Sequence, residues 1–208
     1  MSTKESIVPG YYYHLYNHSN GNLDLFRNEE NYRYFIEKYV KHVHPLVDTY
    51  AYCLLPNHFH FLVKIKTTKG SDPLKGSDPL EASNQITAKQ ITNSIKNWLI
   101  SYTNAYHKVY GTKGNLFHQR TRRKRITDEQ YLLNLIGYIH LNPLFHQLTQ
   151  NATDWKHSSL SNFLNSDLTF IHCKQVLKLF QGKMNFLNYH NEKMITNILK
   201  NLESDFLD

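Results

Sequence analysis

The sequence has little cysteine and no long apolar run. Its 208 residues include two cysteines, Cys53 and Cys173, which are too few for a disulfide framework or a four-cysteine zinc site. The N-terminal stretch MSTKESIVPGYYYHLYNHSN has no apolar signal core, and no segment approaches the roughly 18 consecutive apolar residues that a membrane helix needs. We therefore expect a soluble protein of a reducing, cytoplasmic compartment, with no membrane partner.

Acidic residues are also scarce relative to basic ones. The chain has 17 Asp and Glu against 24 Lys and Arg, a formal charge of +7 and a pI near 9.2. Such a protein is attracted to polyanions, of which nucleic acid is the commonest. Aromatic residues are abundant by contrast, with 11 Phe, 15 Tyr and 2 Trp, and hydrophobic residues make up 40% of the chain. A wholly disordered chain is therefore excluded.

The basic residues concentrate in one short segment, GNLFHQRTRRKRI, at residues 114–126. Cations that neutralise phosphate, combined with aromatic stacking surfaces, are typical of proteins that bind single-stranded or distorted nucleic acid. A solvated run of charge is the alternative interpretation. The predicted DNA-binding residues are Arg120, Arg122, Arg123, Lys124 and Arg125.

Strand and helix patterns alternate along the chain. Strands are predicted over residues 11–18, 46–55, 58–66 and 116–126. Helices are predicted over 29–43, 86–110 and 127–143, the last with a capping box at Thr127 and Gln130 and a stop at Pro143. This order predicts an α+β fold with a ferredoxin-like β-α-β-β-α-β antiparallel sheet, one face of which is packed on helices and the other left free. The helix at 127–143 would be an addition to that arrangement.

We predict a catalytic domain over residues 1–150 and a C-terminal helical extension over 151–208. A polar loop is expected at 67–84, where the hexapeptide KGSDPL occurs twice in succession.

Two histidines stand two residues apart in the predicted strand 58–66. Period-two alternation places His58 and His60 on one face, and the apolar residues Phe59 and Phe61 on the other. Both imidazoles would therefore lie on the face that helices leave open, near enough to share one metal ion. In a chain with 13 histidines, a purely structural role for the pair is an equal alternative.

The predicted helix 127–143 carries a tyrosine and an asparagine one turn apart. At 100° per residue, Tyr138 and Asn142 lie near each other at the edge of the apolar stripe. A phenol oxygen and a carboxamide oxygen can approach the same point there, one as nucleophile and one as ligand. A boundary tyrosine and a C-capping asparagine are the structural alternative.

Taken together, these segments resemble the REP-associated tyrosine transposases, within the single-tyrosine HUH transposases, whose name describes two histidines flanking a hydrophobic residue. The resemblance covers most of residues 8–164. It rests on PGYYYHLYN, YCLLPNHFHFLVKI, GNLFHQR, YLLNLIGYIHLNP and DWKHSSLSNFL, in that order.

The resemblance implies a metal-dependent nickase and strand transferase that acts on single-stranded, hairpin-forming DNA. Tyr138 would be the nucleophile, His58 and His60 would bind a divalent cation, and Asn142 would be a further ligand. Two imidazoles alone are compatible with Zn, Fe or Ni, whereas the family implies Mg or Mn. The protein would act as a monomer or homodimer.

Two other classes of protein fit the same residues. One is a domesticated relative that binds DNA or RNA hairpins without cutting them. The other is a phosphoesterase that uses water in place of tyrosine.

Overall fold

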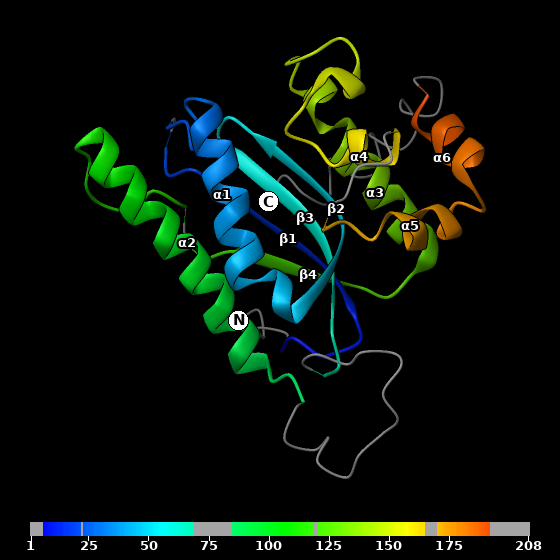
Figure 1. Cartoon of the computed structure of the whole chain (residues 1–208), viewed down its shortest axis with the longest axis horizontal. Helices are drawn as coiled ribbons and strands as arrows, with labels where there is room; N and C mark the ends of the chain where they lie inside the picture. Colours follow the sequence, from blue (N-terminus) through cyan, green and yellow to red (C-terminus); the bar gives the residue numbers. More distant parts are fainter. Residues whose placement is uncertain (1–5, 22, 69–84, 119, 165–169, 192–208) are drawn as a thin grey trace.

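A four-stranded antiparallel sheet forms the centre of the molecule. The computed structural model describes residues 6–21, 23–68, 85–118, 120–164 and 170–191. The strands are β1 (Tyr12–His18), β2 (Val47–Leu55), β3 (His58–Ile65) and β4 (Arg122–Ile126), in the order β2-β3-β1-β4 (Figure 1). Every neighbouring pair is antiparallel. The predicted α+β class and antiparallel sheet are confirmed, and β4 lies at an edge.

Two long helices cover the first face of the sheet. These are α1 (Glu29–His42) and α2 (Ala88–Tyr110), which lie together on one side of the strands in Figure 1. Beneath them is an aromatic core in which Phe35, Phe59, Phe61 and Trp98 are fully buried. The Trp98 indole N–H donates to the Phe35 carbonyl at 3.0 Å and so ties α2 to α1. The predicted apolar face of β3 is therefore correct.

The second face of the sheet is not left free as predicted. The helix α3 (Glu129–Phe145) packs on it, and around α3 lie three short helices, α4 (Leu160–Leu164), α5 (Cys173–Leu179) and α6 (Lys183–His190) (Figure 1). Leu62, on the same face of β3 as the histidines, is fully buried in a second core with residues of α3 such as Leu135 and Ile139. The apolar stripe of α3 covers this face because its burial removes apolar surface from water.

The boundaries of α3 differ from the prediction at both ends. Its N-cap is Asp128 rather than Thr127, because the Asp128 carboxylate accepts the backbone N–H of Tyr131 at 2.6 Å. Pro143 lies inside the helix, which continues to Phe145. A proline in the last turn forfeits one backbone hydrogen bond without ending the helix. The strand predicted over 116–126 is shorter, and Phe117 forms only an isolated bridge with Ser19.

Two predicted segments fall partly outside the described residues. Most of the expected loop with the duplicated hexapeptide lies at 69–84, and the last part of the expected C-terminal helical stretch lies at 192–208. In the described part of the chain, no helix is both long and apolar enough to cross a bilayer.

The segment DWKHSSLSNFL attaches the C-terminal helices to β2. Ser159 makes paired contacts with Tyr52: its backbone N–H donates to the Tyr52 carbonyl at 2.9 Å, and its hydroxyl accepts the Tyr52 N–H at 2.8 Å. The Trp155 indole N–H donates to the Leu54 carbonyl at 2.9 Å. These bonds satisfy backbone groups of β2 at an edge of the sheet, where unpaired strand groups invite association.

Gly137 allows α6 to pack closely against α3. A Cβ atom at this position would lie 2.8 Å from Cε1 of Tyr189, whose hydroxyl donates to Asn134 Oδ1 at 2.7 Å. We expect Gly137→Ala to lower the free energy of unfolding by about 1 kcal/mol, because the clash exceeds the gain in helix propensity of about 1 kcal/mol. In a Tyr189→Ala background the same change should instead stabilise the protein. Urea unfolding of the four proteins tests this, and the same sign in both backgrounds would contradict it.

His190 is expected to make folding sensitive to acid. Its Nδ1–H donates to the Phe186 carbonyl at 2.7 Å, its Nε2 lies 3.0 Å from Nδ1 of His140, and burial lowers its pKa to about 4. Between the unfolded pKa of about 6.5 and the folded value, the unfolded state binds more protons. The contribution of His190 to stability is therefore complete above pH 6.5, and we expect this contribution to decline by about 1–3 kcal/mol as the pH falls toward 4. Urea unfolding at pH 7 and pH 4.5 measures this decline, which should be smaller in His190→Gln; equal declines would contradict it.

Candidate functional site

The sequence-predicted residues of β3 and α3 meet in the structure. His58 and His60 lie on the face of β3 that α3 covers, and their ring centroids are 5.2 Å apart. His58 Nε2 is 3.2 Å from Asn142 Oδ1. The Tyr138 ring stands edge-on to the His60 ring, with centroids 5.5 Å apart. Two imidazoles, a carboxamide and a phenol therefore form one cluster, built from a single chain.

This cluster is more buried than the sequence suggested. Asn142 is fully buried, and only 5% of His60 and 9% of Tyr138 are exposed. The predicted position of Tyr138 and Asn142 at the edge of the buried face is therefore wrong. The reason is that the C-terminal half of α3 is covered on one side by the sheet and on the other by the C-terminal helices.

Two further histidines belong to the site and were not predicted. His14 of β1 has its Nε2 2.9 Å from Nδ1 of His60, and their rings stack with centroids 5.1 Å apart. His146, just after α3, lies with its ring centroid 4.7 Å from that of His58. Alternation along YYHLYNH does place His14 on one face of its strand, but only the pairing of β1 with β3 brings it to His60.

Burial keeps the imidazoles of His14, His58 and His60 neutral. Burial lowers the pKa of His58 to about 4 and that of His60 well below its ordinary value, and neighbouring histidines lower both further. The pKa of His14 falls to about 3, through burial and the nearby charge of Lys124. At neutral pH each ring therefore has one nitrogen lone pair, which is the form that binds metals.

The contacts of His58 fit a metal ligand. Its Nδ1 lies 2.7 Å from Asn57 Oδ1, an acceptor, so the single proton of the neutral ring belongs on Nδ1. The Nε2 lone pair then faces the carboxamide oxygen of Asn142 at 3.2 Å. Two acceptor atoms that face each other repel unless a cation lies between them. Neighbouring ligand atoms around a six-coordinate cation with bonds near 2.1 Å are about 3 Å apart, which matches this spacing.

The same ligand set limits which metals fit. Among the described residues, no group of three or more His, Cys, Asp or Glu side chains is arranged to hold a metal ion. A cation at this site would therefore depend on the Asn142 oxygen and on oxygens of a substrate or water, beside His58 and His60. Oxygen ligands suit Mg and Mn.

His14 is expected to act as a positioning residue for His60. If Nδ1–H of His60 donates to Nε2 of His14, the Nε2 lone pair of His60 is left to bind a cation. We expect His14→Leu to weaken Mn²⁺ binding by about 10–100-fold, as for other residues that orient metal ligands. His14→Gln, which keeps an acceptor, should restore part of the affinity. Electron paramagnetic resonance of free Mn²⁺ measures both, and equal affinity in wild type and His14→Leu would contradict the role.

Comparison with known proteins finds a distant relative in sequence and another in structure. No family model matches the sequence. Over 121 residues it is 23% identical to a Haemophilus influenzae protein assigned to the REP-associated tyrosine transposases; the match covers 58% of this chain and 63% of that protein, less than two thirds of its length. The chain is a distant homologue of these transposases.

A solved structure supports the same fold. The structure of a REP-associated tyrosine transposase bound to a REP hairpin superimposes with a TM-score of 0.56, at 17% sequence identity over 82% of this chain and 88% of that one. The resemblance to the transposases that the motifs indicated is thus confirmed as a distant homology.

The basic residues predicted to bind DNA do not form one surface. Strand register places Arg122 and Lys124 opposite Tyr16 and His14, on the histidine face. Arg123 and Arg125 pair with core residues of the opposite face, and Arg120 is exposed just before the strand. Alternation along a strand is the reason, because successive side chains point to opposite faces. Lys124 Nζ lies 4.8 Å above the Tyr131 ring, between β4 and α3.

Proposed function

We propose that this protein is a metal-dependent, single-strand DNA endonuclease and strand transferase that acts on hairpin DNA, and that it serves DNA transposition. The observation that carries the proposal is the placement of the Tyr138 phenol against His60 in the same cluster as His58 and Asn142. The distant homology and a relative bound to a REP hairpin support DNA as the substrate.

Tyr138 would act as the nucleophile. Its oxygen attacks the scissile phosphorus in line as the phenol loses its proton to water, the bond from phosphorus to the 3′ oxygen breaks, and the departing oxygen takes up a proton from water. The products are a 5′-phosphotyrosine link and a free 3′-hydroxyl. The reverse attack by a 3′-hydroxyl rejoins DNA, and because the phosphodiester energy is conserved in the link, no nucleotide cofactor is needed.

His58, His60 and Asn142 would hold a divalent cation, Mg or Mn. When bound, such a cation polarises the phosphate and stabilises the charge that develops on its oxygens. The contribution of the chain is to keep both imidazoles neutral and oriented, through burial and through the contacts with Asn57 and His14. The carboxamide of Asn142 is held in place by its complete burial in α3.

The basic strand would hold the DNA backbone beside this site. Arg122 and Lys124 are on the histidine face and suit phosphates near Tyr138, since cations on the site's own face neutralise the backbone that approaches it. In this proposal the sheet is the ferredoxin-like core of a catalytic domain over residues 1–150, α3 is the added catalytic helix, and 151–208 is an extension. A monomer suffices for the cluster, because β1, β3 and α3 come from one chain.

The proposal is tested on a denaturing gel with labelled single-stranded hairpin DNA from palindromes beside the gene, in Mg²⁺, Mn²⁺ and EDTA. We expect a covalent protein–DNA adduct in either metal and none in EDTA. Tight hairpin binding without an adduct in any metal would overturn the enzyme and favour a domesticated binding protein. Cleaved DNA without an adduct would favour a phosphoesterase that uses water.

A further inference from the structure

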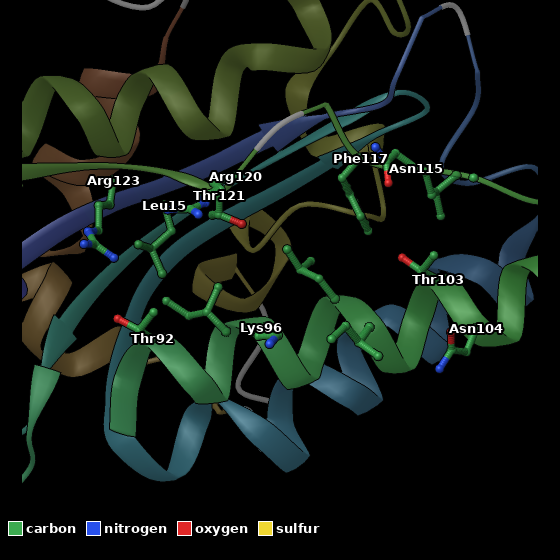
Figure 2. Close-up of a pocket in the computed structure, with 15 residues that line it drawn as sticks. Leu15, Thr92, Lys96, Thr103, Asn104, Asn115, Phe117, Arg120, Thr121 and Arg123 are labelled. Atoms are coloured by element: carbon green, nitrogen blue, oxygen red, sulfur yellow. The ribbon is translucent and has the colours of Figure 1, made fainter. Parts of the chain in front are cut away.

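A groove lies on the face of the sheet opposite the histidine cluster. It has a volume of about 630 Å³ and runs between α2 and the β4 edge of the sheet. Figure 2 shows α2 with Thr92, Lys96 and Thr103 along one side, and Leu15, Phe117 and Arg123 facing it from the other. This volume is within the range of about 300–1,000 Å³ typical of small-molecule sites.

The groove combines an apolar floor with cations at its rim. Leu15, Ile95, Leu116 and Phe117 form the floor and are buried, so the base of the groove has little polar surface. Ile100 also lines the groove, and its side chain is 44% exposed, so it is accessible to a ligand there.

The charged residues of this lining are all basic. They are Lys96 on α2, Arg120 before β4 and Arg123 within β4, and no described lining residue is acidic. A ligand that complements such a groove has a flat apolar part and a negative charge at its end. A nucleotide has both, as an aromatic base and a phosphate.

We propose that this groove binds an unpaired nucleotide of the DNA, with its base on the apolar floor and its phosphate against Lys96, Arg120 and Arg123. This inference rests on the proposed function for the identity of the polymer, but the groove lies apart from the residues that would carry out the chemistry. Guanidinium groups suit the phosphate because they present several N–H donors in a fixed plane.

The position of β4 connects the groove to the histidine cluster. β4 is an edge strand, so a nucleic-acid strand can pass around it from one face of the sheet to the other. Along the way it meets Arg123 on the groove face, and then Arg122 and Lys124 on the histidine face. The basic residues of β4 alternate between the two faces of the sheet. Because β4 is at the edge, a strand of DNA that passes around it would meet basic residues on both faces.

The test combines a groove variant with abasic substitutions in the DNA. Ile100→Glu places a carboxylate in the groove, and Val109→Glu is the matched control, because Val109 is 69% exposed on the same helix and does not line the groove. Affinity is measured by fluorescence anisotropy for a hairpin with single-stranded flanks, in which each unpaired nucleotide is made abasic in turn. Circular dichroism confirms that both variants fold.

We expect Ile100→Glu to weaken binding by about 10-fold or more, and Val109→Glu to leave it unchanged. One abasic position should weaken wild-type binding by a similar factor, yet cause no further loss in Ile100→Glu, because the two changes remove the same contact. A blunt hairpin without flanks should bind wild type and Ile100→Glu equally.

Two results would overturn the inference in distinguishable ways. In the first, wild type and Ile100→Glu bind the flanked hairpin equally well, or every abasic substitution weakens binding of Ile100→Glu as much as it weakens binding of wild type. The groove then does not hold a nucleotide, while the proposed function stands. If wild type binds no hairpin, the proposed function fails and the nucleotide site fails with it.

Discussion

Tyr138→Phe is expected to abolish the covalent protein–DNA adduct and to lower cleavage by roughly 10⁴-fold or more. The substitution removes one oxygen, and with it the only atom of this side chain that can form a bond to phosphorus. The ring, its edge-on contact with His60 and its stacking on Phe145 remain possible. Folding and hairpin affinity should therefore be close to those of wild type, so that the loss is confined to the chemical step.

Tyr131→Phe is the matched control for this variant. Tyr131 lies on the same helix, two turns before Tyr138. Its ring also contacts the sheet, because Lys124 of β4 lies over it. Because its hydroxyl has no part in the proposed reaction, adduct formation should stay within a few-fold of wild type. If Tyr138→Phe still formed the full amount of adduct, or if Tyr131→Phe lost it, Tyr138 would not be the nucleophile. Mass spectrometry of the adduct peptide identifies the modified residue directly.

His60→Ala is expected to reduce metal-dependent adduct formation by about 10³-fold or more. The change removes one imidazole from the proposed cation site, and charge stabilisation at a reacting phosphate is among the largest single contributions to such catalysis. Mn²⁺ affinity, measured by electron paramagnetic resonance without DNA, should fall together with activity. This second readout links the loss of activity to the loss of the cation.

His44→Ala is the control for His60→Ala. His44 lies at the other end of the β2–β3 hairpin, just before the residues that pair with the end of β3, and its ring contacts Phe170. Removing this half-buried histidine shows the effect of losing an imidazole from the hairpin without a change at the site. Unchanged Mn²⁺ affinity in His60→Ala would remove His60 from the proposed ligand set.

Local patterns in the sequence predicted most of the sheet and its helices. Alternation along residues 58–66 identified which side of β3 is apolar, because side chains of a strand alternate between faces regardless of what packs on them. Helical spacing likewise identified the stripe of Leu132, Leu135 and Ile139 that α3 buries. Propensity could not locate the end of α3 at Phe145, since a proline in a last turn is tolerated when the helix is buried on both sides.

The candidate site was predictable in part for the same reason. His58 and His60 share a strand, and Tyr138 and Asn142 share a helix, so each pair follows from the period of its own element. That the two pairs meet depends on the packing of α3 against β3. His14 joins them only because β1 lies beside β3 in the sheet, a pairing between residues far apart in the chain.

The sequence by itself determined the chemistry available to this protein. It determined which side chains share a face of one strand or helix, and it placed several basic residues in succession along one strand. Only the tertiary structure decided how buried those groups are, that His14 contacts His60, and that the cations of β4 divide between the histidine cluster and the groove beside α2. The physical reason is that local patterns specify the direction of a side chain within its element. Distances between elements are decided by strand order and by the burial of apolar surface across the whole fold.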